Sequence, residues 1–425
     1  MTQLRLILGK ILNPISDSSI KYYPDGLLVL EKVKAEEYKV VKITRSSEIN
    51  KYKGEIFDFS DRVIIPSFFD MHFHWVQDDV RQMPKDSLLD WLDKYTFPTE
   101  AKFKNKTFSR KEAKHFFKRL VKVGTLGGAC FSSVHEHALD DAFENCIGDF
   151  VIGNVLMTMN SPKSLIQTKD EAKKTVDNGF KKYKNKYAVT PRFAIATDPE
   201  TMKYGHEKAR KRKAFIQSHL SENKAEIEFV LDIYKNMKGF ERVETYTDIY
   251  DQVNGLGPQT LMAHGIHLSS KELTKLARTK TSIIHCPTSN APTKKLGLGS
   301  GLFDFKQVEK HKVRWALGSD IGGGPYLSMF DVMQSFVAQN NSKDATYSKA
   351  LFRSTLMGAK ILGIEKTHGN LQRNKWGNLL VLSKIKTYQD DCPEKILKRI
   401  CHKYRNSREK YDTLVENVFY KGKMI

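Results

Sequence analysis

The stretch VIIPSFFDMHFHWVQ, residues 63–77, places His72 and His74 one residue apart at the end of an apolar run. Residues i and i+2 of a β-strand point to the same face of a sheet, so both imidazoles can reach one point in space. Two such histidines can equally be ordinary packed or surface residues. The metal-binding interpretation gains support from later runs that also end in metal-ligand or proton-transfer residues: His219 with Glu222, His264, and Asp320.

Short apolar runs alternate with helix-like segments from Val63 to about Gly363, which is the pattern of repeated βα units. Eight such runs can be counted: VIIPSFFDMHFH, GTLGGACFSS, FVIGNVLMTMN, YAVTPRFAIA, AFIQSHLSEN, TLMAHGIHL, TSIIHCPTSN and VRWALGSDIGGG. Segments between them, such as KEAKHFFKRLVKVG, carry apolar residues at helical spacing. The sequence therefore predicts an α/β fold of the TIM type, a (β/α)8 barrel with its active site at the carboxyl ends of the strands.

Several polar residues fall at or just after the last apolar residue of their runs: His74, Arg192, His219, His264 and Asp320. A closed barrel would bring them to one mouth. Neutral imidazoles and a carboxylate suit a divalent ion such as Zn2+, which leaves a position for water and lowers the pKa of that water. Glu222 could pass protons beside such an ion. A carboxylate at a helix N-terminus is its structural alternative.

Both ends of the chain look like strands without helices. The N-terminal runs LRLILGKIL, GLLVLEKV, YKVVKI and RVIIP are separated by Asn13-Pro14, Pro24-Asp25-Gly26 and polar links, and GNLLVL and TLVENVFYKGKMI follow near the C-terminus. We expect residues 1–65 and 366–425 to form a small β-sandwich domain and residues 66–365 to form the catalytic barrel. The charged segment 384–410 is interpreted as a surface excursion, helical near Glu394 to His402.

Bulk composition favours a globular enzyme, with 425 residues of which 40% are hydrophobic. No apolar run approaches a membrane span, and the N-terminus lacks the core of a secretory signal, so we expect a cytoplasmic protein without a membrane partner. The five cysteines form no CxxC pair, which suits a reducing compartment.

The net charge of +21 permits attraction to nucleic acid. The lysines, however, are spread over several segments at the spacing of solvated helix faces, and neither zinc-finger spacing nor an aromatic RNA-binding signature is present. We therefore expect no nucleic-acid partner. A basic nucleic-acid-binding protein on an inactive barrel is the interpretation from a different functional class.

Other motifs leave narrower alternatives. His135 and His137 form a second HxH pair, on the loop after the second run, and could touch a substrate. His285 could line the site or bond to its own loop. The sequence contains neither HExxH nor the PCxxC of the cytidine-deaminase type, which excludes two rival zinc chemistries.

The motifs IIPSFFDMHFH, QSHLSEN, LMAHGIHLS, HCPTSN and LGSDIGGG occur in the order typical of the amidohydrolase superfamily of metal-dependent barrels, which the chain resembles. The segments HFHWVQ, SLLDWLDKYTFPTE and VTPRFA are similar to those of its guanine deaminase family. Ser67, Gly323 and Asn378 stand where that family commonly has Gly, Ala and Asp. None of these departures touches an expected ligand.

The resemblance implies a zinc enzyme that hydrolyses guanine to xanthine and ammonia. It implies one zinc ion per chain, with iron as the alternative ion, held by His72, His74, His219 and Asp320. His264 would lie against the metal-bound water, Asp320 would accept its proton, and Glu222 would deliver a proton to the purine ring.

The same resemblance implies that Gln77, Arg192 and Phe193 hold the base and that the protein is a homodimer. Trp91 and Tyr95 could wall the pocket or simply pack as aromatic residues. The superfamily motifs also serve other aminated rings. A deaminase or chlorohydrolase acting on 8-oxoguanine, a pterin or a triazine is therefore the alternative enzyme.

Overall fold

A computed structural model describes residues 3–85, 87–292, 297–403 and 414–425. The chain divides into two compact units. One comprises the described residues of Met1–Asp70, Arg119–Gly127 and Leu327–Ile425, and the other those of Met71–Lys118 and Gly128–Tyr326. The domain boundaries expected after residues 65 and 365 stay a prediction.

Each predicted barrel run carries one strand of two four-stranded sheets. One sheet has the order β5 (Phe68–His74), β6 (Thr125–Ser132), β7 (Asp149–Leu156) and β8 (Thr190–Pro191), and the other β12 (Arg314–Leu317), β11 (Ser282–His285), β10 (Thr260–His264) and β9 (Ile216–Leu220). A parallel bridge between Val189 and Ile216 joins the β8 and β9 sides. Beyond β12, Asp320 N–H donates to the carbonyl of His72 on β5 at 2.8 Å. The curled arrangement is consistent with the predicted barrel.

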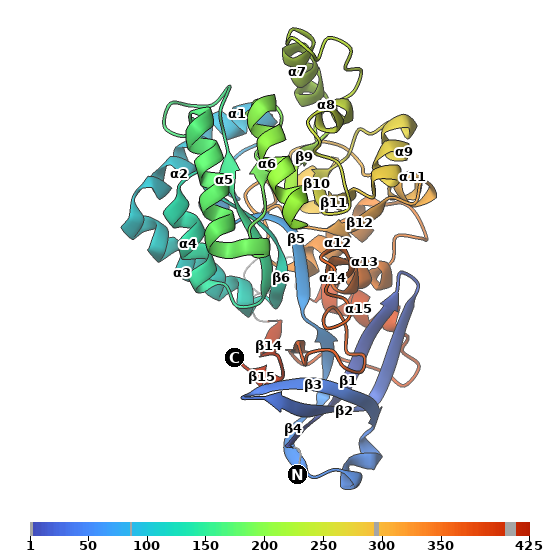
Figure 1. Cartoon of the computed structure of the whole chain (residues 1–425). Coiled ribbons are helices and arrows are strands. Elements are labelled where there is room, and N and C mark those ends of the chain that lie inside the picture. Colours follow the sequence, from blue (N-terminus) through green and yellow to red (C-terminus); the bar gives the residue numbers. More distant parts are fainter. Residues whose placement is uncertain (1–2, 86, 293–296, 404–413) are drawn as a thin grey trace. The chain divides into compact units, whose positions relative to one another are not determined.

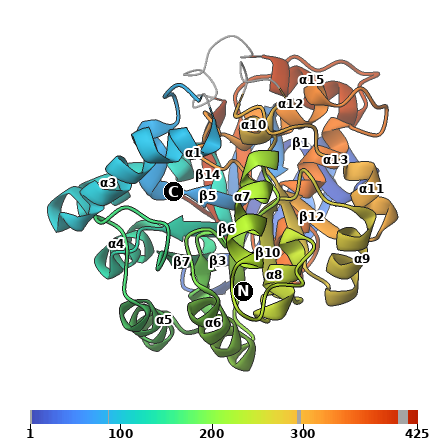
Figure 2. The same ribbon diagram turned by 90° about the horizontal axis from the view of Figure 1, so that it is seen from above.

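Helices follow most of these strands, and most of them lie around the strands in Figure 2. They are α3 (Lys106–Lys122), α4 (Glu136–Asn145), α5 (Lys169–Tyr183), α6 (Pro199–Arg212), α7 (Lys224–Lys235), α8 (Tyr246–Gln252), α9 (Ser270–Thr279) and α11 (Phe305–Lys310). Capping boxes explain where several begin: Thr168 with Glu171 starts α5, and Ser269 with Glu272 starts α9. Two short helices between β5 and β6 concern the site: α1 (Leu88–Trp91) and α2 (Phe97–Ala101).

The strands from both chain ends form one seven-stranded sheet of order β15-β14-β13-β4-β1-β2-β3, in which Figure 1 shows β1, β2 and β3 side by side. Their bounds are β1 (Leu4–Ser16), β2 (Ser19–Lys34), β3 (Glu37–Arg45), β4 (Gly54–Pro66), β13 (Leu379–Leu382), β14 (Val415–Tyr420) and β15 (Lys423–Met424). The expectation that the C-terminal strands join the N-terminal layer is confirmed. A cluster that includes Ile7, Leu28, Ile64, Val381 and Phe419 forms its core.

Two of the expected strand separators were wrong. Strand β1 continues through Asn13-Pro14 to Ser16, and β2 already includes Pro24. The register jumps from Gly9 opposite Gly26 to Ile11 opposite Tyr23, so Pro24 and Asp25 sit in a bulge. Because a bulge leaves its residues outside the hydrogen-bonded ladder, it tolerates a proline that has no N–H.

The first unit also contains the helices α12 (Met329–Gln339), α13 (Tyr347–Arg353), α14 (Leu356–Ile361) and α15 (Pro393–His402). Helix α15 agrees with the helix expected near Glu394 to His402. The excursion is not purely a surface feature, because α15 buries Ile396, Leu397 and Ile400 and the Glu394 carboxylate accepts from Tyr347 N–H. Residues 404–410 of that segment lie outside the described residues. Among the described helices, none has the length and apolarity needed to cross a membrane.

The approach of β7 to the chain before β8 requires a glycine at 153. A Cβ there would lie 1.9 Å from the Ala188 carbonyl oxygen and 2.1 Å from Thr190 Oγ1. We predict that Gly153→Ala lowers the free energy of unfolding by about 1–3 kcal/mol, the usual effect of overpacking. Urea denaturation measures the change.

Gly257→Ala is the control, since its nearest neighbours would be 3.7 Å away or more. Equal denaturation midpoints for Gly153→Ala and the wild type would contradict the close approach.

Candidate active site

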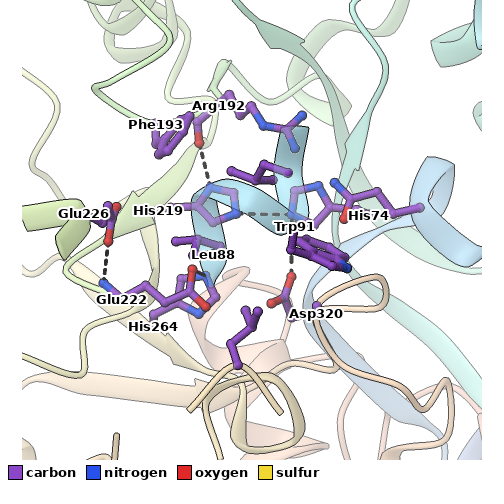
Figure 3. A pocket seen from close by; sticks show the side chains of 14 residues that line it. His74, Leu88, Trp91, Arg192, Phe193, His219, Glu222, Glu226, His264 and Asp320 are labelled. Carbon is purple, nitrogen blue, oxygen red and sulfur yellow. Dashed lines mark hydrogen bonds and ion pairs between the residues drawn. The ribbon is translucent and has the colours of Figure 1, made fainter. Parts of the chain in front are cut away.

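Four side chains from three strand ends converge on one point. The ligand atoms of His72, His74, His219 and Asp320 all lie within 4.8 Å of one another. His74 Nε2 is 3.2 Å from His219 Nε2, and Asp320 Oδ1 is 3.3 Å from His72 Nε2 and 3.6 Å from His74 Nε2. Figure 3 shows His74, His219 and Asp320 pointing toward one another. The arrangement brings together the four residues that the sequence analysis selected as ligands.

Local backbone geometry orients the side chains of the site. His72 and His74 alternate with Phe73 on β5 and therefore share a face. His264, the last residue of β10, and Asp320, after β12, have φ values of +74° and +48°. Left-handed backbone at residues other than glycine costs free energy and persists where the surroundings impose it, which is common at functional sites.

The donor set fits a divalent cation. His219 Nδ1–H donates to the Arg192 carbonyl at 2.6 Å, so Nε2 carries the lone pair that faces His74. Burial and the neighbouring histidines hold the pKa of His74 and His219 well below the usual value, which keeps both imidazoles neutral. Neutral imidazoles and one carboxylate are ligands suited to zinc and similar ions.

A second group lies beside the first. Glu222, His264 and Asp320 also bring their ligand atoms within 4.8 Å of one another, with His264 Nε2 3.5 Å from Glu222 Oε2. Burial, followed by the Asp320 and Glu226 carboxylates, raises the pKa of Glu222 well above its usual value. Burial alone would also raise the pKa of Asp320, but His72 and His264 bring it below its usual value. Two carboxyl groups with pKa values pushed apart can serve as acid and base.

Asn290 connects the groups that could move protons. Its Nδ2 donates to Glu222 Oε1 at 3.0 Å, and its Oδ1 lies 3.1 Å from His264 Nδ1. With Nδ2 directed at Glu222, the amide turns its oxygen to His264, so the neutral His264 imidazole donates from Nδ1 and keeps Nε2 as an acceptor. The sequence analysis missed Asn290, although it ends the quoted HCPTSN motif.

The helix N-terminal role suggested as the alternative for Glu222 is filled by its neighbours. Asn223 caps α7, and Glu226 Oε2 accepts from the backbone N–H groups of Glu222 and Asn223. Burial raises the pKa of Glu226 to about 7. Glu222 itself faces the cavity (Figure 3).

A cavity of about 410 Å³, counting the open solvent at its mouth, adjoins both groups. Its lining includes all four residues expected to contact a substrate: Gln77, Trp91, Arg192 and Phe193. Leu88 and Leu92 add an apolar wall, whereas Tyr95 is not among the lining residues. Glu100, which belongs to the quoted SLLDWLDKYTFPTE segment but received no role, bonds to Gln77 and Arg192 from behind.

The other histidines considered lie elsewhere. His135 and His137 stack on each other with ring centres 5.8 Å apart, and His137 Nε2 lies 2.7 Å from the Phe103 carbonyl oxygen. His285 stacks on Phe303 at 4.3 Å. None of the three is in either ligand group or lines the cavity.

The model of the amidohydrolase family matches residues 63–425. The chain is 32% identical to the guanine deaminase of Escherichia coli over 385 residues, which cover 87% of this chain and 84% of that protein. It is 30% identical to the guanine deaminase of Dictyostelium discoideum, with 86% of each covered. A crystal structure of guanine deaminase from C. acetobutylicum with bound guanine superposes with a TM-score of 0.86 at 26% identity, covering 100% of both chains.

We predict that His74→Ala, which removes one of the four donors, weakens zinc binding by at least about tenfold, since even supporting residues of metal ligands contribute that much. Metal analysis after dialysis against a graded zinc buffer measures the loss.

His135→Ala belongs to the HxH pair that does not converge, and it should keep the zinc content of the wild type. Unchanged zinc binding by His74→Ala would remove that residue from the ligand set.

Proposed function

The chain belongs to the amidohydrolase family, and on that premise we propose that it is a zinc-dependent guanine deaminase that hydrolyses guanine to xanthine and ammonia. The observation that carries the proposal is the convergence of four ligand side chains, three buried and one half-buried, beside Glu222 at a cavity lined by Arg192 and Phe193. The similarity to guanine deaminases over most of the chain supports this substrate over other rings.

His72, His74, His219 and Asp320 would hold the zinc ion, and their mutual distances support this assignment. When bound, the ion supplies Lewis-acid chemistry that makes water a nucleophile near neutral pH. The chain's own contribution is to keep the His74 and His219 imidazoles neutral and to orient the ligands. The bond from His219 to the Arg192 carbonyl does this for one of them.

Asp320 and Glu222 divide the proton transfers between them. Asp320, whose pKa is lowered, accepts the proton of the attacking water. Glu222, whose pKa is raised, carries a proton to the ring nitrogen as C2 is attacked. The proton held by Asp320 then passes to the amine, which leaves as ammonia, while the C2 hydroxyl returns a proton to Glu222 and becomes the carbonyl of xanthine. His264 holds the water through Nε2, because Asn290 takes its Nδ1–H.

Arg192, Phe193, Gln77 and Trp91 would hold the base. The buried Arg192 donates to the O6 carbonyl of guanine, and the Phe193 ring offers a face for the purine. Trp91 closes a wall of the cavity. A site of buried polar groups rejects a ring that leaves them unpaired.

The alternatives from the sequence keep distinct outcomes. An enzyme for an oxidised purine, a pterin or a triazine would share the ligands but prefer another ring. An inactive, nucleic-acid-binding barrel would have lost ligands, whereas all four converge.

The finer expectations about the molecule follow the same proposal. We infer that the curled sheet closes as a (β/α)8 barrel and that the strands of both chain ends form a β-sandwich. The expected homodimer and cytoplasmic location stay predictions, which light scattering and cell fractionation would check.

We predict that Glu222→Gln keeps its zinc and loses about 10²- to 10⁴-fold in kcat on guanine, the usual contribution of a proton-transferring group. Ammonia release and metal analysis measure the two effects.

Glu228→Gln, an exposed residue of α7, is the matched control and should be as active as the wild type. Wild-type turnover by Glu222→Gln would exclude Glu222 from the reaction.

We predict that chelation abolishes xanthine formation and that added Zn2+ restores it, because the attacking water depends on the ion. A panel of guanine, 8-oxoguanine, a pterin and an aminotriazine compares kcat/KM values. The absence of ammonia from guanine with zinc loaded would refute the proposed function, and better recovery with iron would refute the choice of metal.

A further inference from the structure

We propose that Glu100, which lies behind the cavity wall, fixes the hydrogen-bonding polarity of Arg192 and Gln77 and thereby selects rings with a lactam edge, a carbonyl next to a ring N–H. Glu100 is a positioning residue in this scheme, because it acts through the two side chains that reach the substrate. The inference rests on the proposed function and adds the residue that determines its specificity.

The Glu100 carboxylate is almost fully buried, with 1% of its surface exposed, on the short helix α2. Arg192 Nη1 donates to both of its oxygens, at 2.8 Å to Oε1 and 2.7 Å to Oε2. The Arg192 guanidinium also lies 5.0 Å from the centre of the Phe97 ring, on the same helix. One guanidinium nitrogen is therefore bonded to Glu100. Arg192 lines the cavity, and because a guanidinium has no acceptor, its remaining N–H groups can act there only as donors.

Gln77 shares the same carboxylate. Its Nε2 donates to Glu100 Oε1 at 2.7 Å. Because an ionised carboxylate accepts and never donates, the amide cannot be turned over. The Gln77 oxygen Oε1 then points away from Glu100 and lies against Gly322, where a Cβ would come within 2.3 Å of it. A side chain at 322 would occupy the place of that oxygen.

The two side chains thus acquire opposite hydrogen-bonding roles. Arg192 offers donors, and Gln77 offers the oxygen of its oriented amide as an acceptor. The pair complements a carbonyl oxygen and an adjacent ring N–H, which guanine carries as O6 and N1–H. A ring with an amine at C6 and a bare N1, such as 2,6-diaminopurine, presents the reverse pattern and leaves buried groups unpaired.

The test compares kcat/KM for guanine with kcat/KM for 2,6-diaminopurine, the latter followed as isoguanine by chromatography. In Glu100→Gln the new amide can accept from or donate to Gln77, so Gln77 can turn over. We expect the preference for guanine to fall by about tenfold or more, since hydrogen-bond complementarity carries such discrimination. Zinc content should equal that of the wild type.

Glu100→Gln also leaves the Arg192 charge without its buried partner and could prevent folding. Glu100→Asp is the second variant: it keeps the charge, but its carboxylate is one methylene shorter and cannot hold both partners in place. Here the preference should fall while thermal unfolding stays cooperative. If Glu100→Gln does not fold, Glu100→Asp alone decides.

The matched control is Glu272→Gln, a buried carboxylate of the α9 capping box that bonds to Thr247 and does not line the cavity. It should lose stability without any change in the preference for guanine. An unchanged preference in a folded Glu100 variant, or an equal fall in Glu272→Gln, overturns the inference. No turnover of guanine by the wild type would instead overturn the proposed function.

Discussion

The hydrogen bond from Asp320 N–H to the His72 carbonyl is the constraint on which the proposed metal-ligand set depends. It joins the chain after β12 to β5, and these segments carry the last and the first of the four candidate ligands in chain order. Metal donors must lie within a few ångströms of a common centre. The segments that carry them must therefore be held at a fixed distance from one another. This backbone hydrogen bond holds the two segments together, and Asp320 there has a left-handed conformation.

Electrostatics inside the site follow from how few groups are charged. Burial holds the pKa of His74 and His219 well below the usual value and keeps them neutral, and the charge of Arg192 is balanced by Glu100. Glu222 and Asp320 could not both be ionised at this proximity without cost, and their surroundings push their pKa values in opposite directions. Asn290 ties one of these carboxylates to His264. The site therefore holds two neighbouring carboxyl groups whose proton affinities differ, as the proposed proton transfers require.

The strand-end residues could be predicted from the sequence because two patterns, period-2 alternation and the βα repeat, can be read from short segments. Together they indicate which residues meet in the folded chain. His72 and His74 share a face by strand geometry, and the repeat implies a common mouth for His219 and Asp320. Glu100 and Asn290 could not be found in this way, since their partners are distant in sequence and only packing shows which groups each one meets.

The contrast between local sequence patterns and long-range contacts also explains why two strand separators at the N-terminal end were predicted wrongly. Proline and glycine normally end strands. Pro24 does not end β2, because it lies in a bulge and takes no part in the hydrogen-bonded pairing. Register is decided between strands and cannot be read from one strand alone. The segment 384–410 was predicted to lie on the surface because it is highly charged. Helix α15 within it nevertheless has apolar residues at helical spacing, and these are buried.

One part of the cavity wall comes from the segment between β5 and β6. Leu88, Trp91, Leu92 and Glu100 all come from this short stretch, which contributes none of the clustered metal-binding side chains. This part of the wall and the candidate metal ligands therefore lie on separate segments of the chain. Substitutions in the segment between β5 and β6 could therefore change which ring the cavity accepts and leave the candidate metal ligands unchanged.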